Sequence, residues 1–162
     1  AVLWLLFGLI APRQKAGRLR PATAAFVGIL CLQVLYGALV AGRHAGMGYN
    51  TFPLMDGHLW PPGIAALAPG WLNLLENNTT VQFIHRGLAW TLASFALGLF
   101  VASRTIAVPA ELRRRYGLLL AAVALQFTLG MLTLLLKVPV ALAAAHQGGA
   151  LLLFAAALWA LF

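Results

Sequence analysis

Five apolar segments divide the chain, and polar residues gather in the loops between them. The segments are Ala1–Ala11, Ala22–Gly42, Thr79–Ser103, Tyr116–Leu136 and Val138–Phe162. A helix needs about 20 consecutive apolar residues to cross a bilayer, so all but the first segment are long enough to span one. The pattern predicts an all-α integral membrane protein, a four-transmembrane-helix bundle, with Ala1–Ala11 as the incomplete end of a preceding helix.

Composition favours a membrane protein over a soluble one. Hydrophobic residues make up 62% of the 162 positions and charged residues only 9%, whereas a soluble domain carries about 25% charged residues. Ala1–Ala11 is too short to span, and the last segment reaches Phe162 without a polar flank. We therefore expect the chain to be part of a larger membrane protein.

Basic residues are concentrated in two of the loops, Pro12–Pro21 and Arg104–Arg115. Because basic loops stay on the cytoplasmic side of a membrane, residues 12–21 are predicted to be a cytoplasmic loop. Residues 22–162 then form the four-helix unit, with an outer loop at 43–78 and an outer turn at Lys137. Topology accounts for the net charge of +8, so nucleic acid is not expected as a partner.

Two histidines occupy similar depths in helices that both run inward from the outer side. Asn78 is expected to be the N-cap of one helix and Pro139 to lie in the first turn of the other. His85 and His146 each follow by seven residues, which places both about 10 Å below the outer helix ends. Two imidazoles at one depth suit the axial positions of a haem iron, whereas hydrogen bonding between helices is the alternative.

Residues around the histidines fit a haem site in two ways. Small residues would let a flat macrocycle approach the helix backbones: Gly87, Ala89, Ala143, Gly148, Gly149 and Ala150. Arg86 and Arg43 are placed to pair with haem propionates, and Arg86 is alternatively an interfacial anchor. His44 and His58, in the outer loop, are expected to be solvated.

An internal repeat relates the two helices that precede the histidine-bearing helices. LQVLYGAL at 32–39 and LQFTLGML at 125–132 share Leu-Gln and, at matching offsets, Gly and Leu. Each copy lies in an outward-running helix that precedes an inward-running helix with a histidine. This predicts two helix pairs related by an axis along the membrane normal. The long outer loop between the copies is either an interfacial loop or a cap over the cofactor.

Three motifs closely resemble the haem A synthase family, in its mitochondrial and proteobacterial branch: GALVAGRHAGMGYNTFPLMDG, FIHRGLAW and LLLKVPVALAAAHQGGALLL. Members of this family have eight transmembrane helices in two homologous halves, and the chain resembles the C-terminal half plus the tail of the preceding helix. The resemblance implies oxidation of the C8 methyl of haem O to the formyl group of haem A. It also implies that His85 and His146 are axial ligands of a haem b cofactor that transfers electrons.

The family's N-terminal half carries a glutamate shortly before its first histidine, whereas this chain has Gln82 at the corresponding place. We therefore expect this half to transfer electrons, with haem O oxidised in the N-terminal half, outside this chain. The resemblance implies a bacterial or mitochondrial inner membrane, a haem site toward its outer side, and haem O synthase and cytochrome oxidase assembly factors as partners. Homo-oligomerisation is left open. The alternatives are a b-type cytochrome membrane subunit that only transfers electrons, and a haem-free transporter or assembly factor.

Overall fold

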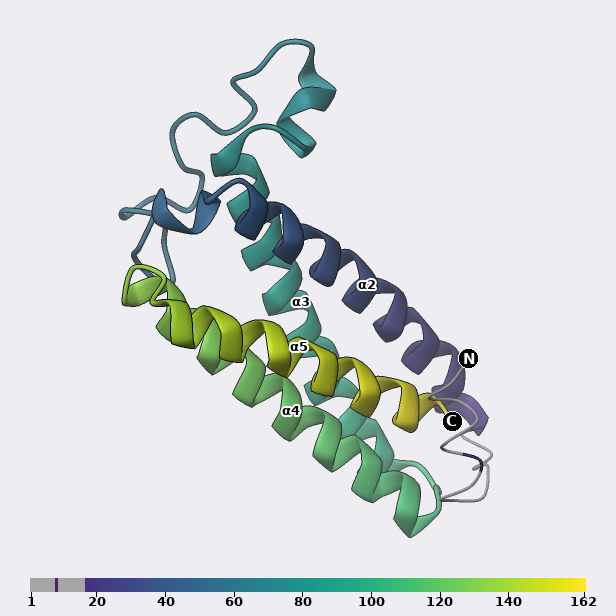
Figure 1. The fold of residues 1–162 in the computed structure, drawn as a ribbon. Coiled ribbons are helices and arrows are strands. Elements are labelled where there is room, and N and C mark those ends of the chain that lie inside the picture. The colour runs from purple at the N-terminus through teal and green to yellow at the C-terminus, as the bar shows by residue number, and fades with distance from the viewer. Residues whose placement is uncertain (1–7, 9–16) are drawn as a thin grey trace.

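The computed structural model describes Gly8 and residues 17–162, and the long elements among them are all α-helices (Figure 1). They are α2 (Arg20–Gly42), α3 (Asn78–Thr105), α4 (Ala110–Leu135) and α5 (Val140–Leu161). Each is long and apolar enough to cross a membrane. The predicted all-α membrane bundle is thus confirmed. The expected helix end at Ala1–Ala11, apart from Gly8, and positions 12–16 of the expected cytoplasmic loop lie outside the described residues.

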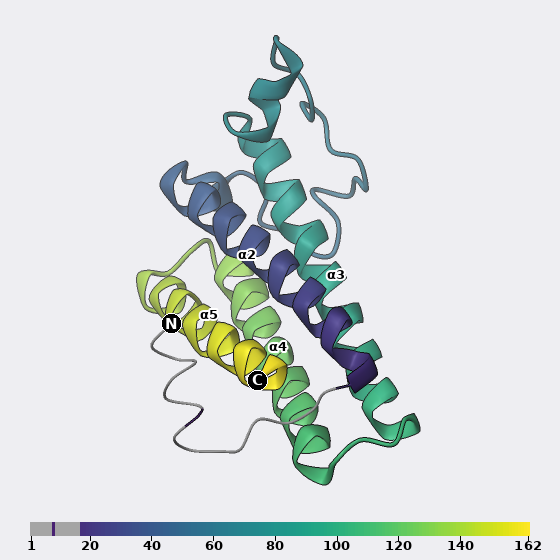
Figure 2. The same cartoon turned by 90° about the vertical axis from the view of Figure 1, so that its right-hand side faces the viewer.

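The four helices form a closed ring in chain order. α2 packs on α3, α3 on α4, α4 on α5, and α5 returns to α2, as the two views of the ribbon show (Figures 1 and 2). α3 and α5 therefore occupy diagonal corners of the bundle. These are the two helices that carry the histidines, so the topology turns their side chains toward a shared interior.

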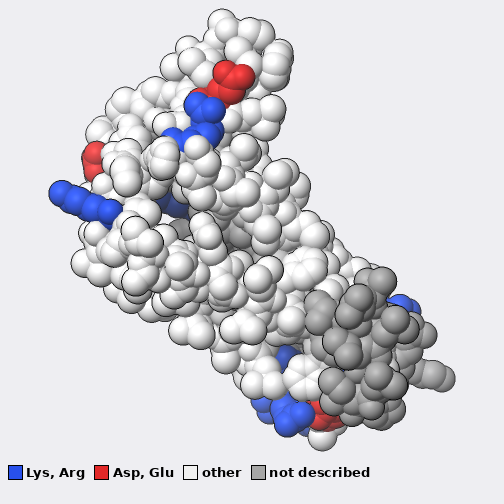
Figure 3. Space-filling view, viewed as in Figure 1, with Lys and Arg blue, Asp and Glu red and all other residues white. Residues whose placement is uncertain are grey.

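Two helices begin earlier than their apolar segments do. α2 starts at Arg20, where Pro21 suits the first turn, and α4 starts at Ala110 after Pro109. The predicted basic loop Arg104–Arg115 is therefore mostly helical, with a link of only residues 106–109. An apolar segment marks the thickness of the hydrocarbon, whereas a helix can continue into the polar interface. Charged side chains accordingly lie toward the two ends of the face seen in Figure 3, with an uncharged band between them.

The start of α3 corrects one predicted cap. Asn77, not Asn78, is the N-cap, because its side-chain oxygen accepts a hydrogen bond from the backbone N–H of Thr80 at 3.2 Å. Asn78 is the first helical residue, and its side-chain oxygen accepts a hydrogen bond from Arg43 at 2.8 Å. Pro139 lies at the N-cap of α5, just before its first turn.

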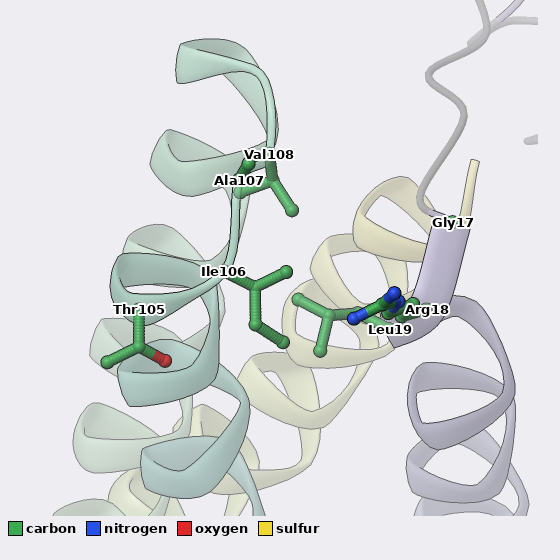
Figure 4. A pocket seen from close by; sticks show the side chains of 7 residues that line it. All are labelled: Gly17, Arg18, Leu19, Thr105, Ile106, Ala107 and Val108. Atoms are coloured by element: carbon green, nitrogen blue, oxygen red, sulfur yellow. The ribbon is translucent and has the colours of Figure 1, made fainter.

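A packed apolar core fills only one end of the bundle. Its buried residues lie toward the starts of α2 and α4 and toward the ends of α3 and α5: Leu19, Phe26, Leu30, Leu92, Ala96, Leu99, Leu112, Tyr116, Leu119, Val123, Leu153, Ala157 and Ala160. These parts of the helices all meet at the end that is cytoplasmic in the predicted topology. The surface pocket in Figure 4, between residues 17–19 and 105–108, lies at this end too.

The opposite end of the bundle has no comparable core. Within these fully described helices, no apolar side chain of α2 after Leu30, of α4 after Val123 or of α5 before Leu153 is buried. In α3 the one buried apolar side chain at this end is Val81, at the helix start, beside the buried polar residues Thr80 and Gln82. Both histidines lie in this loosely packed outer end.

Candidate functional site

His85 and His146 face the bundle interior from its diagonal helices. His85 follows the first residue of α3 by seven positions and His146 follows the first residue of α5 by six, which are rises of about 10 and 9 Å. Both side chains are partly buried. The two side chains lie near each other. The structure thus brings the two histidines together at nearly one depth.

Each imidazole packs against a glycine of the preceding helix. A Cβ at Gly37 of α2 would lie 3.3 Å from Cε1 of His85, and a Cβ at Gly130 of α4 would lie 2.8 Å from Cε1 of His146. Non-bonded carbon atoms pack best at about 3.5–4.0 Å. Only glycine therefore leaves room for His146 in its present position, and the room beside His85 is nearly as limited.

A glutamine one turn before each glycine contacts the same histidine. Nε2 of Gln33 lies 3.4 Å from Nε2 of His85, and Nε2 of Gln126 donates a hydrogen bond to the carbonyl oxygen of His146 at 2.7 Å. These glutamines and the two glycines are among the residues that match between the two copies of the internal repeat. Sequence patterns found the repeat but not its role, because the partner histidines are distant in the chain.

Several polar atoms at this site are buried without a hydrogen-bond partner among the described residues. They include Nδ1 of His85, Nδ1 of His146, Oε1 of Gln33 and Oε1 of Gln126. Buried polar groups are nearly always hydrogen-bonded, and leaving one unpaired costs about 1–3 kcal/mol. All four lie in the end of the bundle that lacks a core, which favours a site that receives a ligand.

The donor set fits a haem better than a bare metal ion. Among the described residues, no three His, Cys, Asp or Glu side chains gather as a metal-binding group. A structural zinc ion takes about four protein ligands, whereas a haem brings its own equatorial nitrogens and needs only axial ligands from the protein. Two imidazoles at nearly one depth, in an end of the bundle without a buried apolar core, match the second requirement.

Small residues next to the histidines were expected to let a macrocycle approach the helix backbones, and the structure corrects this in part. Gly87 and Gly148 are exposed, and a Cβ at either would meet nothing within 4 Å. Each lies two positions after its histidine, about 200° around the helix, so neither lines the interior. The space at Gly149 is taken by the side chain of Gln126. The glycines that make room for the imidazoles lie instead on the neighbouring helices.

Arg86 holds the outer loop against α3. Its guanidinium donates hydrogen bonds to the backbone oxygens of Tyr49 at 2.7 Å and Thr51 at 2.8 Å. Gln82, one turn earlier, donates to the same Tyr49 oxygen at 3.0 Å. Arg86 therefore attaches the loop to α3, and so does Gln82, which stands where the family's N-terminal half carries a glutamate.

Residues 46–51 of the outer loop also contact the end of α4 and the turn between α4 and α5. Nδ2 of Asn50 donates a hydrogen bond to the carbonyl oxygen of Leu134, at the end of α4, at 3.0 Å. Gly46 lies against the side chain of Val138, in the turn between α4 and α5. A Cβ added at Gly46 would lie only 3.3 Å from Cγ2 of Val138. Residues 46–51 thus cross from α2 over α3 to the α4–α5 turn. This arrangement favours the interpretation of the loop as a cap.

Aromatic stacking continues this attachment on the outside of α3 and α4. The ring of Phe52 stacks on Trp90 with a centroid distance of 5.7 Å and meets Phe127 edge-on at 5.9 Å. Trp90 and Phe127 themselves contact at 4.9 Å. The cap is therefore attached to the helices by apolar as well as polar contacts.

The remaining candidates lie at the edge of the site. Arg43 donates hydrogen bonds to Asn78 at 2.8 Å and to the backbone oxygen of Glu76, so it joins the end of α2 to the start of α3. Pairing of Arg43 or Arg86 with propionates stays a prediction. His44 and His58 are exposed in the outer loop, as predicted.

Fold and site together define an integral membrane protein whose four-helix bundle carries a pair of histidines at nearly one depth on diagonal helices. Residues 1–158 match the model of the COX15-CtaA family, described as cytochrome oxidase assembly protein. The chain belongs to this family, as its motifs predicted.

Curated relatives agree with this assignment. The Heme A synthase of Nitrosospira multiformis is 46% identical over 98% of this chain and 46% of its own length. The Heme A synthases of Nitrosomonas eutropha and Wolbachia pipientis wMel are 42% and 40% identical over 98% and 93% of this chain, and 47% and 42% of their own lengths. The chain thus spans about half the length of these relatives. No solved structure matches it significantly.

Proposed function

We propose that the chain is the C-terminal, haem b-binding half of a haem A synthase, an oxidoreductase that converts the C8 methyl of haem O into the formyl group of haem A. The proposal rests chiefly on the facing pair His85 and His146, whose Nδ1 atoms are buried and unpartnered in an end of the bundle that lacks a packed core. The similarity to Heme A synthases over 98% of the chain supports it.

The residues of this half would bind and enclose the cofactor. His85 and His146 would ligate the haem iron, and Gly37 and Gly130 leave room for each imidazole beside the neighbouring helix. A bound haem b would supply one-electron redox chemistry. The cap at residues 46–51 would limit water access from the outer side, and a drier surround helps to set a haem potential.

Carboxylate placement agrees with an electron-transfer role. The three acidic residues of the chain are Asp56, Glu76 and Glu111, and none lies on the helix turns that carry His85 and His146. Gln82 is hydrogen-bonded to the cap and offers no acid or base for methyl oxidation. The substrate haem O would accordingly bind in the N-terminal half, where its methyl group would be oxidised, and haem b would carry electrons away from that site.

The setting of this function follows from the same proposal. The protein would reside in a bacterial or mitochondrial inner membrane, with the histidine pair toward the outer side. Haem O synthase would supply its substrate, and cytochrome oxidase assembly factors would be further partners. A b-type cytochrome that only transfers electrons is the second candidate, because the same histidine pair without a nearby acid would serve it equally well.

Spectroscopy of single variants tests the ligand assignment. His85→Ala and His146→Ala should each abolish the low-spin bis-histidine spectrum of haem b while the protein still inserts into the membrane. His44→Ala and His58→Ala are matched controls, since both are exposed loop histidines, and should keep the spectrum. A normal spectrum in either ligand variant contradicts the assignment.

Pigment analysis separates the enzyme from a cytochrome. Cells that make haem O but no haem A should accumulate haem A only when they express the protein. Haem A in the absence of the protein, or none in its presence, contradicts the enzymatic proposal even if the bis-histidine spectrum is present.

A further inference from the structure

Residues 57–75 of the outer loop form an arm that projects from the start of α3. In Figure 1 this arm lies beyond α2 and α3, on the side away from α4 and α5, and points across the direction of the spanning helices. Only residues 76 and 77 separate it from the first residue of α3. The base of the arm therefore lies where the predicted spans meet the outer surface of the membrane.

The exposed surface of the arm is apolar and carries no charge. Residues 57–75 contain no Asp, Glu, Lys or Arg, and the end of the arm is uncharged in the view of Figure 3. Leu59 and Trp60 are 80% and 66% exposed, although both are large apolar side chains. The full set of large exposed apolar residues in the arm is Leu59, Trp60, Leu67, Trp71, Leu74 and Leu75. A concentration of this kind marks a surface that contacts a protein or a membrane.

Two buried asparagines pair backbone groups within the arm. Nδ2 of Asn73 donates hydrogen bonds to the backbone oxygens of Leu67 at 2.8 Å and Gly70 at 2.9 Å, and its Oδ1 accepts one from the N–H of Leu67 at 2.9 Å. Nδ2 of Asn77 donates to the backbone oxygen of Gly63 at 2.8 Å. Unpaired backbone groups keep irregular segments out of lipid. Internal pairing therefore lowers the cost of moving this arm out of water.

Contacts with α3 hold the arm in place. The ring of Trp60 meets the ring of Phe83 edge-on, with a centroid distance of 5.4 Å. Oγ1 of Thr80 accepts a hydrogen bond from the backbone N–H of Ala65 at 3.2 Å. The arm is thus attached to a membrane-spanning helix by apolar and polar contacts, so its apolar surface keeps a fixed position beside the bundle.

We propose that the arm docks on the outer surface of the lipid bilayer, with Trp60 and Trp71 among the lipid headgroups. Indole rings favour this region because one edge is polar and the rest is apolar. Lipid suits the arm better than a protein partner, since a protein interface surrounds its apolar centre with a polar rim and residues 57–75 have no charged side chain. The outer loop then has both predicted roles: residues 46–51 form the cap, and residues 57–75 contact the membrane. This docking does not depend on a bound haem.

Fluorescence quenching in the complete protein, reconstituted in phospholipid nanodiscs, tests the docking. Native cysteines, including Cys31, are first replaced by serine, and an environment-sensitive dye is then attached at Leu59→Cys or Trp71→Cys. Both positions are exposed, so labelling should preserve the fold. Each dye should be quenched by phospholipids with a nitroxide on the headgroup and protected from aqueous iodide. Asp56→Cys is the matched control, because Asp56 is exposed in the same loop but outside the arm. Its dye should be quenched more by iodide and less by the lipid nitroxide.

Two results would overturn the proposal. If the dyes at Leu59→Cys and Trp71→Cys are quenched by iodide as strongly as the dye at Asp56→Cys, the arm lies in water. If they are protected from both iodide and the lipid nitroxide, protein covers the arm, either the rest of the complete protein or a second copy. Leu151→Cys confirms that the lipid probe works, because Leu151 is 75% exposed on a spanning helix and its dye should be quenched by nitroxides on the acyl chains.

Discussion

Gly130→Ala is the sharpest test of the histidine site, because it adds a single methyl group at a known distance from a proposed ligand. The new Cβ would lie 2.8 Å from Cε1 of His146 and 3.3 Å from its Nε2. Carbon atoms pack at about 3.5–4.0 Å, so the ring or the helix must move by roughly 0.7–1.2 Å. The imidazole of His146 is the group that the added methyl displaces.

The size of the effect follows from packing energetics. Overpacking a well-fitted site costs about 1–3 kcal/mol, and each 1.4 kcal/mol is about a tenfold change in an equilibrium constant. Haem b affinity should therefore fall about 5- to 150-fold in Gly130→Ala. Gly37→Ala places its Cβ at 3.3 Å from Cε1 of His85, a smaller overlap, so its effect should be weaker.

Haem titration followed by the Soret band measures these differences. Gly148→Ala is the control, because it changes a glycine of the same histidine-bearing helix where a Cβ meets nothing within 4 Å, and it should bind haem normally. The reasoning is refuted if Gly130→Ala binds haem as tightly as Gly148→Ala. It is also refuted if Gly37→Ala is the more damaging of the two glycine variants at the site.

Further predictions concern the cap, a helix end and the topology. Arg86→Leu removes charged hydrogen bonds to the loop backbone, each contributing about 1.5–3 kcal/mol. Amide exchange at residues 49–51 should therefore quicken, unlike in Arg113→Leu, which changes an exposed arginine. Asn77→Ala should destabilise the protein by about 1 kcal/mol, as loss of an N-cap does, and more than Asn78→Ala in thermal unfolding; equal losses would argue against the cap assignment. Lys137→Cys should react with an impermeant thiol reagent from the outer side and Arg113→Cys only after permeabilisation; the reverse would invert the topology.

Helix number could be predicted from the sequence, whereas helix ends could not be placed closely. Four segments of α-helix follow from hydrophobic length alone, because a bilayer imposes one thickness on every span. The start of α4 was misplaced by six residues because Glu111 and the arginines near it are polar yet helical. Glu111 pairs with Arg114 at 3.2 Å and with Arg115 at 3.4 Å, and such i,i+3 and i,i+4 pairs stabilise a helix outside the hydrocarbon.

The roles of the arginines were open in the sequence for a different reason. Arg86 was a candidate for a propionate partner or an interfacial anchor, and both assignments depend only on its depth. Its actual partners are the backbone oxygens of Tyr49 and Thr51, which have no sequence signal. Contacts of a side chain with the backbone of a distant loop leave no pattern in the loop's residue types.

The sequence by itself determined the class of protein, the number of spans, the family, and the pairing of His85 with His146 by depth. These depend on quantities that add along a single helix: length, hydrophobicity, and rise per residue. Only the tertiary structure decided what surrounds the pair. The diagonal placement of α3 and α5, the lack of a buried apolar core at the outer end, and the contacts of Gln33 and Gln126 arise from packing between helices.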